Sequence, residues 1–175
     1  MKIKWMVYFI LSLVVTACSV QATGTTGEAF ELYLLEDSQA HGSDIINTPL
    51  NDITLAETPL LTTADLVSYE HSTHTLQLTD GGFQKVTDLL EEGFQVAGIP
   101  FVIVSRGERI YAGAFWTMLS SQSFDGVVIM DPVFLTESNT IQITLGYPGS
   151  GFFTGTDPRA DARLMDALEG AGVLK

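Results

Sequence analysis

The residues best suited to chemistry in this 175-residue chain are His71 and His74, which are separated by two hydroxyl residues. Imidazole nitrogens bind transition metals, but a zinc site needs three or four ligands. The nearest further candidates are Asp65 and Glu70, and the only other histidine is His41. Residues three apart share a face on a helix, whereas on a strand they point to opposite faces. The flanking pattern predicts strands and a turn, so the two rings converge only if the turn brings them together.

A nucleophile is not indicated by the remaining polar motifs. Gly149-Ser150-Gly151 lacks the Gly-x-Ser-x-Gly spacing that holds a serine on a strained elbow, and a glycine turn explains it better. Asp157 followed by Pro158 predicts a helix cap and a proline at the first helical position. We therefore expect no catalytic residue, no metal ligand and no cofactor. A metal-dependent or hydrolytic enzyme centred on His71 and His74 is the alternative.

Aromatic residues form the most suggestive group for binding. Adjacent aromatic side chains on a strand face opposite ways, so they cannot both enter one core. Exposed aromatic clusters are typical of binding surfaces. The sequence therefore predicts a binding patch, with burial in the core as the alternative, at Tyr111, Phe115, Trp116, Phe152 and Phe153.

These residues must be positioned by a fold rich in strands. Apolar runs and alternation predict strands at 30–35, 52–55, 67–69, 75–78, 99–104, 109–112, 126–130 and 140–145, with a loop over 36–49. Capping residues and apolar stripes predict helices over about 79–90 and 157–168 and one helical turn at 62–66. Short turns connect most strands. We expect an α+β fold, with a mainly antiparallel sheet and two principal helices, in a single compact domain over 29–175.

Part of this order of elements resembles a known family. Pro59-Leu60-Leu61-Thr62 with Asp65-Leu66, Leu76-Gln77-Leu78-Thr79 before a helix, and the apolar strand from Gly98 to Val104 before the Gly107 turn carry the likeness. Residues 57–130 resemble the head part of the first periplasmic domain of SecD-type protein-export membrane proteins. The resemblance implies a short helix after a threonine, then a strand–helix–strand unit and a hairpin. It implies no catalytic or binding residue.

The charge of the chain excludes some partners. The chain has eight basic and 21 acidic residues, and its formal net charge is −13. Lys2 and Lys4 lie in the first 17 residues and no acidic residue does, so removal of that segment would bring the net charge to −15. Such a surface repels phosphate backbones and anionic lipid headgroups. We expect no nucleic-acid partner and no polybasic membrane contact.

The first 17 residues predict export. A positive start, Met1 to Lys4, precedes an apolar run from Trp5 to Val15, which is too short to span a hydrocarbon core of ~30 Å comfortably. This pattern matches a secretory signal peptide. Its exit, Val15-Thr16-Ala17-Cys18, resembles the lipobox of bacterial lipoproteins. The resemblance implies cleavage after residue 17 and lipidation of Cys18. An ordinary signal peptide with an incidental cysteine is the alternative.

The lipid on Cys18 would then hold the protein at the membrane. Cys18 is the only cysteine, so the chain offers it no disulfide partner. Two or more acyl chains anchor a protein firmly, and the Gly/Thr-rich residues 18–28 suit a flexible tether. Ser19 in place of an aspartate favours the outer membrane where the host has one. The sequence thus predicts a non-enzymatic interaction or accessory domain on the extracytoplasmic side of the bacterial cell envelope, with an envelope protein as its candidate partner.

Overall fold

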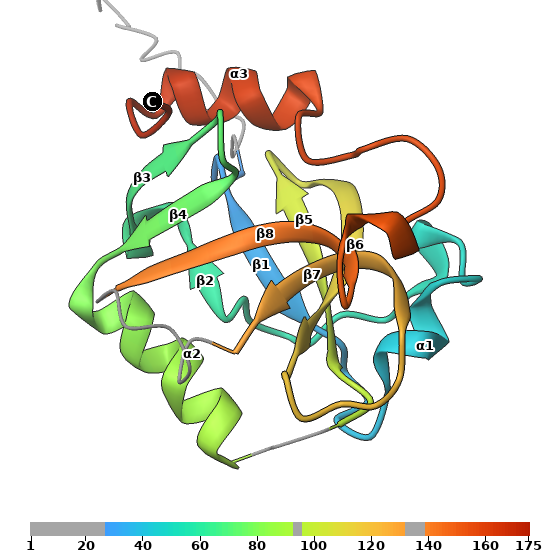
Figure 1. Cartoon of the computed structure of the whole chain (residues 1–175). Coiled ribbons are helices and arrows are strands. Elements are labelled where there is room, and N and C mark those ends of the chain that lie inside the picture. Colours follow the sequence, from blue (N-terminus) through green and yellow to red (C-terminus); the bar gives the residue numbers. More distant parts are fainter. Residues whose placement is uncertain (1–26, 93–95, 132–138) are drawn as a thin grey trace, which may run out of the picture.

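A computed structural model of the chain describes residues 27–92, 96–131 and 139–175 (Figure 1). The predicted leader, Cys18 and the tether as far as residue 26 lie outside the described residues. The strands are β1 (Glu31–Leu34), β2 (Leu61–Thr62), β3 (Leu66–Glu70), β4 (Thr75–Leu78), β5 (Ile99–Ser105), β6 (Glu108–Trp116), β7 (Phe124–Met130) and β8 (Thr140–Tyr147). The helices are α1 (Gly42–Ile45), α2 (Asp80–Glu92) and α3 (Ala162–Gly170), with 3-10 turns η1 (Leu50–Asp52), η2 (Thr63–Asp65) and η4 (Ser150–Phe152).

The eight strands form one curled sheet in the order β2-β1-β5-β6-β7-β8-β4-β3. The fold is therefore α+β, as predicted. The sheet is mixed, because β6 and β7 run parallel while the other neighbouring strand pairs are antiparallel. The parallel register covers only Gly113↔Val127 to Trp116↔Met130. Because β6 and β7 pair over so few residues, the short connection through residues 117–123 is long enough to bring the chain back for parallel pairing.

The two edge strands of the sheet follow one another in the sequence. β2 and β3 stand at opposite ends of the strand order, yet only η2 separates them along the chain. The outer side of β3 is occupied by the end of the chain. The amide of Tyr69 donates to the carbonyl of Val173, and the amide of Lys175 donates to the carbonyl of Tyr69, at 2.7 and 2.8 Å. Both sides of β3 therefore have backbone partners.

Hydrophobic cores lie on both faces of the sheet. The inner core is enclosed by the curl and by α2 and α3, which contribute Val86, Leu90, Leu164 and Leu168 (Figure 1). The outer core lies on the other face of β5, β6 and β7, where Ile45 of α1 and Ile53 cover it. Because the sheet is covered on both faces, neighbouring residues of one strand are buried on opposite sides.

Local sequence signals explain most element boundaries. Thr79 caps α2, since its Oγ1 accepts from the amide of Gly82 at 3.1 Å. The β5–β6 hairpin turns at Arg106 and Gly107, both with positive φ (49° and 80°), as a two-residue turn requires. The expected helical turn at 62–66 is η2.

The predicted start of the last helix is wrong. Asp157 does not cap a helix, because its carboxylate binds the side chain and amide of Arg159. Asp161 is the N-cap instead, accepting from the amide of Arg163 at 2.9 Å, and α3 begins at Ala162. Residues 36–49, expected as a loop, contain α1, and the expected strand at 52–55 is reduced to a single bridge between Leu55 and Leu35.

Candidate functional site

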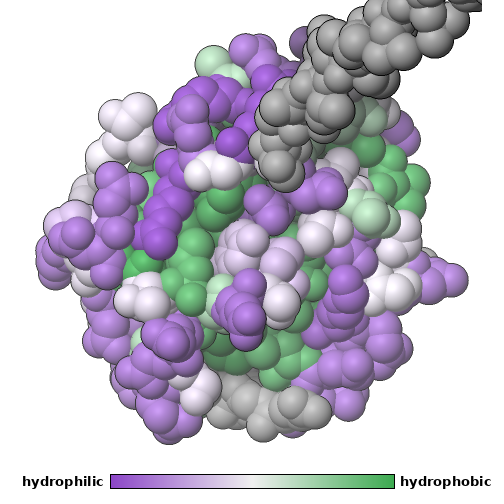
Figure 2. Space-filling model, turned by 180° about the vertical axis from the view of Figure 1, so that it is seen from behind, coloured by the Kyte–Doolittle hydropathy of each residue, from purple (hydrophilic) through white to green (hydrophobic). Residues whose placement is uncertain are grey.

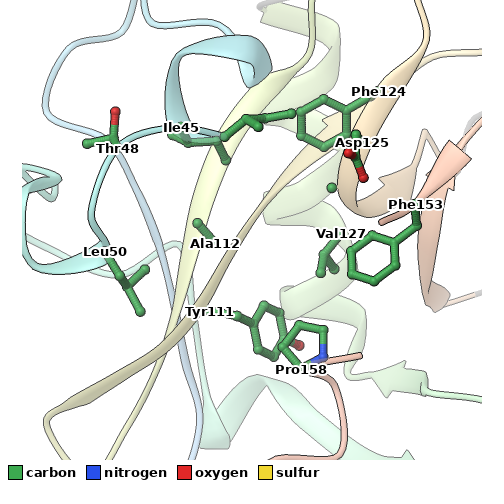
Figure 3. A pocket seen from close by; sticks show the side chains of 12 residues that line it. Ile45, Thr48, Leu50, Tyr111, Ala112, Phe124, Asp125, Val127, Phe153 and Pro158 are labelled. Carbon is green, nitrogen blue, oxygen red and sulfur yellow. The ribbon is translucent and has the colours of Figure 1, made fainter. Parts of the chain in front are cut away.

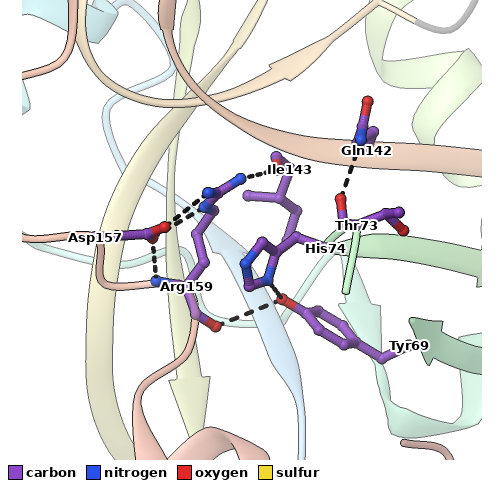
Figure 4. A network of polar contacts seen from close by, with 7 residues as sticks. All are labelled: Tyr69, Thr73, His74, Gln142, Ile143, Asp157 and Arg159. Carbon is purple, nitrogen blue, oxygen red and sulfur yellow. Dashed lines mark hydrogen bonds and ion pairs between the residues drawn. The ribbon is translucent and has the colours of Figure 1, made fainter. Parts of the chain in front are cut away.

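The turn between β3 and β4 brings the two candidate histidines together. His74 has a left-handed backbone (φ 52°), and its ring centroid lies 5.8 Å from that of His71, edge to face. The Nδ1 atom of His74 is 2.9 Å from the hydroxyl oxygen of Tyr69, within hydrogen-bonding distance (Figure 4). This histidine turn, residues 70–75, therefore achieves the convergence that a regular strand would prevent.

The charges around His74 oppose a bound cation. Burial lowers the pKa of His74, the guanidinium of Arg159 lowers it further, and the carboxylate of Asp157 offsets part of that effect. Arg159 is itself held by Asp157, with Nη2 and Oδ2 2.7 Å apart, and its Nη1 donates to the carbonyl of Ile143 at 2.8 Å (Figure 4). A fixed positive charge next to an imidazole disfavours both its protonation and metal binding.

No group of three or more His, Cys, Asp or Glu side chains that could hold a metal ion occurs among residues 27–92, 96–131 and 139–175. The two carboxylates proposed as further ligands are engaged elsewhere. Asp65 binds Lys85 at 2.9 Å, and Glu70 accepts from the amide and hydroxyl of Ser72. The contacts of the histidine turn are those of a structural link. They join β3, β8 and the segment that precedes α3 into one network.

The predicted aromatic patch does not form at three of its five positions. Tyr111, Phe115 and Trp116 are 5%, 1% and 3% exposed. The two adjacent rings enter different cores, as side chains that face opposite ways must, and both are buried because the sheet has a core on each face. The predicted exposure of Phe115 and Trp116 is therefore wrong. Phe115 packs in the inner core, and Trp116 packs in the outer one, stacked on Phe124 with ring centroids 4.8 Å apart.

The other two aromatic residues remain at the surface. Phe152 is 49% exposed, and Phe153 is partly buried. Turn η4 places them, since the amide of Phe153 donates to the carbonyl of Ser150 at 3.1 Å. Figure 2 shows that apolar side chains also reach the surface between hydrophilic ones on the rear face of the molecule. Exposed apolar residues are thus not confined to one side of the described domain, and a pocket is needed to distinguish a binding site.

A pocket of about 270 Å³ lies where β6 and β7 separate (Figure 3). The register of these strands begins at Gly113, so residues 108–112 of β6 pair with β5 on one side and with no strand on the other among the described residues. The side chains in this opening come from α1 and its following loop, from β6 and β7, and from the segment between η4 and α3. The lining residues are Ile45, Ile46, Thr48, Leu50, Tyr111, Ala112, Phe124, Asp125, Gly126, Val127, Phe153 and Pro158.

The pocket joins apolar walls to two polar groups. The carboxylate of Asp125 accepts from the amide and the hydroxyl of Thr154, both at 2.6 Å, and these hydrogen bonds lower its pKa. Asp125 is therefore ionised at neutral pH. The hydroxyl of Tyr111 is buried and has no hydrogen-bond partner among the described residues, and burial raises its pKa well above the usual value. An unsatisfied buried hydroxyl is uncommon in folded proteins.

A shallow acidic depression adjoins this pocket. It shares Ile45 and Thr48 with the pocket and is otherwise lined by Leu35, Glu36, Asp37, Ala40, Asp44, Ile53 and Thr54. The carboxylates at 36, 37 and 44 are all exposed. Arg109 contacts this region, but its Nη1 donates to the carbonyls of Leu50 and Ile53 at 2.5 and 2.6 Å, and Arg109 lines neither hollow. The outer side of the shared wall is thus acidic.

The sequence identified two of the pocket residues, Tyr111 and Phe153, for their aromatic character, and it missed Phe124, Asp125 and the α1 segment. No local signal marks them, because they converge only when a short parallel register forms between β6 and β7. Phe115 and Trp116, which were predicted together with Tyr111, do not line the pocket.

Comparisons of the chain with protein-family models, with curated proteins and with solved structures found no match. None of the helices in the described part of the chain has the length and apolar character needed to cross a bilayer. The likeness of residues 57–130 to SecD-type domains stays a prediction.

Proposed function

We propose that this chain is a lipid-anchored lipoprotein of the bacterial cell envelope whose domain is a non-enzymatic interaction module for an envelope protein. The observation that carries the interaction role is the open pocket at the β6–β7 separation. It combines exposed apolar groups, a partly exposed aromatic ring and an ionised carboxylate. Apolar pockets with a few fixed polar groups are the usual form of binding sites.

The anchoring part of the proposal is supported by the sequence. Cys18 is the only cysteine and follows a small-residue exit from a short apolar run. A formal net charge of −13 argues against adsorption on anionic lipid, so an acyl anchor would supply the attachment. We propose that the anchor lies in the outer membrane where the host has one and that the domain faces away from the cytoplasm.

Labelling with a fatty acid tests the anchor. The full chain, expressed in a bacterium with the lipoprotein-processing machinery, should incorporate labelled palmitate and sediment with membranes. The Cys18→Ala variant should do neither. Unlabelled wild-type protein in that host would refute lipid anchoring.

Site-specific photo-crosslinking in intact cells tests the interaction role. A photoreactive amino acid replaces Ile46, which lines the pocket, or Phe152, which precedes the lining residue Phe153 in sequence; the two are 42% and 49% exposed. The matched control is Val67 on β3, which is 52% exposed and does not line the pocket. We expect one adduct, identified by mass spectrometry, from the pocket positions only. Its loss in a background with Ala112→Leu, which fills the pocket, would tie the adduct to the site. Equal adducts at Val67 would contradict the proposal.

One observation favours the alternative of a metal-dependent or hydrolytic enzyme, namely the contact between the rings of His71 and His74. Elemental analysis of the purified chain tests it, because a transition metal at one equivalent that is lost on replacement of both histidines would support a metal enzyme.

A further inference from the structure

We propose that the partner segment recognised at this pocket is an extended peptide that carries an apolar side chain flanked by basic residues. This inference rests on the interaction role proposed above and adds the chemistry of the partner. It is argued from the volume of the pocket, the free side of β6 and the distribution of charge around the opening.

The pocket has the size for a side chain. Sites for small molecules and cofactors usually enclose roughly 300–1,000 Å³. The volume here is about 270 Å³, which is below that range. Its walls come mainly from apolar groups, among them Ile45, Leu50 and Val127, and the ring of Phe153 stands at one side (Figure 3). One aromatic or branched aliphatic side chain would satisfy these walls.

The side of β6 that has no strand partner in the described part of the chain is the reason to expect that the peptide binds with an extended backbone. Residues 108–112 of β6 have a strand partner on the β5 side only, within the described residues. A strand edge presents unpaired amide and carbonyl groups, and extended peptides bind such edges by adding a strand. Ala112 and Tyr111 belong both to this stretch and to the pocket lining. Tyr111 and Ile110 are buried, whereas Ala112 is partly exposed, so Ala112 is the position beside the pocket that an added strand can reach. A peptide paired with β6 would therefore place one side chain over the opening.

The carboxylates around the pocket favour a peptide segment that carries basic residues. Asp125 stands on one side of the pocket, and the depression containing Glu36, Asp37 and Asp44 lies on the other side of the wall formed by Ile45 and Thr48. The guanidinium of Arg109 is bound to backbone carbonyls. Basic side chains that precede and follow the apolar one would face carboxylates on both sides.

The same charges argue against a second copy of this chain as the occupant. Each copy carries a formal net charge of −13, so two copies would repel one another unless basic residues met at the contact. Among the described basic residues, Lys85, Arg159 and Arg163 are paired with carboxylates.

The test measures binding of a defined probe to the full lipidated chain in nanodiscs of phosphatidylcholine, which has no net charge. The probe is a fluorescent eight-residue peptide in which lysines alternate with threonines around one central phenylalanine. Matched probes carry glutamate for every lysine, serine for the phenylalanine, or methyl groups on alternate backbone nitrogens. Fluorescence anisotropy reports binding, and empty nanodiscs give the background.

We expect saturable binding of the basic probe and a loss of roughly tenfold or more in affinity for each matched probe. An increase in NaCl from 50 to 500 mM should weaken binding severalfold, because the exposed carboxylates are screened. Asp125→Asn together with Asp44→Asn should weaken binding about fivefold, whereas Glu169→Gln on α3, a control with an exposed carboxylate outside both hollows, should change it less than twofold.

Several results would overturn the inference. These are equal affinity for the basic and acidic probes, no effect of backbone methylation, or unchanged affinity in a folded Ala112→Leu variant. A concentration-dependent dimer that Ala112→Leu abolishes would assign the pocket to a second copy. The probe series needs only the wild-type chain, so it remains decisive if a variant fails to fold. A pocket-dependent crosslink to a partner whose contacting segment is acidic would refute this inference and leave the interaction role intact.

Discussion

Replacing Ala112 with leucine should stabilise the protein while it removes binding. Ala112 is partly buried and lines the pocket between β6 and β7. Leucine adds three carbon atoms, each stabilising by about 0.8 kcal/mol when it is fully buried. The upper limit is therefore about 2.4 kcal/mol. The pocket opens to solvent, so roughly half of that value, about 1 kcal/mol, is expected, with a rise of about 2–4 °C in the melting temperature.

The matched control is Ala114→Leu. Ala114 lies two residues further along β6, belongs to the outer core and is fully buried. It does not line the pocket. Added carbon atoms have no open space there, and overpacking of this kind costs typically about 1–3 kcal/mol. Replacement of alanine by leucine should thus raise the free energy of unfolding at position 112 and lower it at position 114.

Urea unfolding followed by tryptophan fluorescence measures both changes. Trp116 is the only tryptophan after residue 17, and it is buried beside Phe124. Its emission should therefore report loss of the outer core. A destabilised Ala112→Leu variant, or one whose native emission shifts toward that of exposed tryptophan, would refute the reasoning, because the space beside Ala112 would then be filled in the native protein.

Three other outcomes follow from the polar contacts. Asp65→Ala should lower the free energy of unfolding by about 2 kcal/mol, as it removes the cap of η2 and the partly exposed ion pair with Lys85; thermal denaturation checks this. Asp157 has a pKa of about 2 in the folded protein, lower than the ~3.9 of an unfolded chain, because Arg159 binds it. Its contribution is present above about pH 4 and is lost as the pH falls toward 2. Asp157→Asn should accordingly flatten the loss of stability in acid, and a slope equal to that of the wild type would contradict the assignment. Purified protein should contain less than a tenth of an equivalent of transition metal, measured by elemental analysis, because Arg159 repels a cation at the histidine turn.

Much of the fold could be predicted from local patterns. The apolar run at 99–104 and Gly107 fix the β5–β6 hairpin, and the cap at Thr79 with its apolar stripe fixes α2. The start of α3 was mispredicted for a definable reason. Asp157-Pro158 fits the pattern of a cap followed by proline, but Arg159 competes for the same carboxylate, and a two-residue motif does not reveal that competition.

The pocket could be predicted only in part. Aromatic character marked Tyr111 and Phe153, but the burial of Trp116 depends on a second core that α1 and Ile53 supply from 50 or more residues away in sequence. The parallel register of β6 and β7 is equally nonlocal. Its late start at Gly113 creates the opening, and neither alternation nor turn residues encode where a register begins.

Residues 173–175 protect the edge strand β3 from pairing with other copies of the chain. Residues 173–175 supply the backbone partners of the outer side of β3, so that strand offers no free template to another molecule. The lipid anchor proposed above would confine the protein to a surface, where encounters between copies are frequent. Removal of these three residues would expose Tyr69 and its neighbours on β3 to such encounters, and self-association through added strands would then become the route to aggregation.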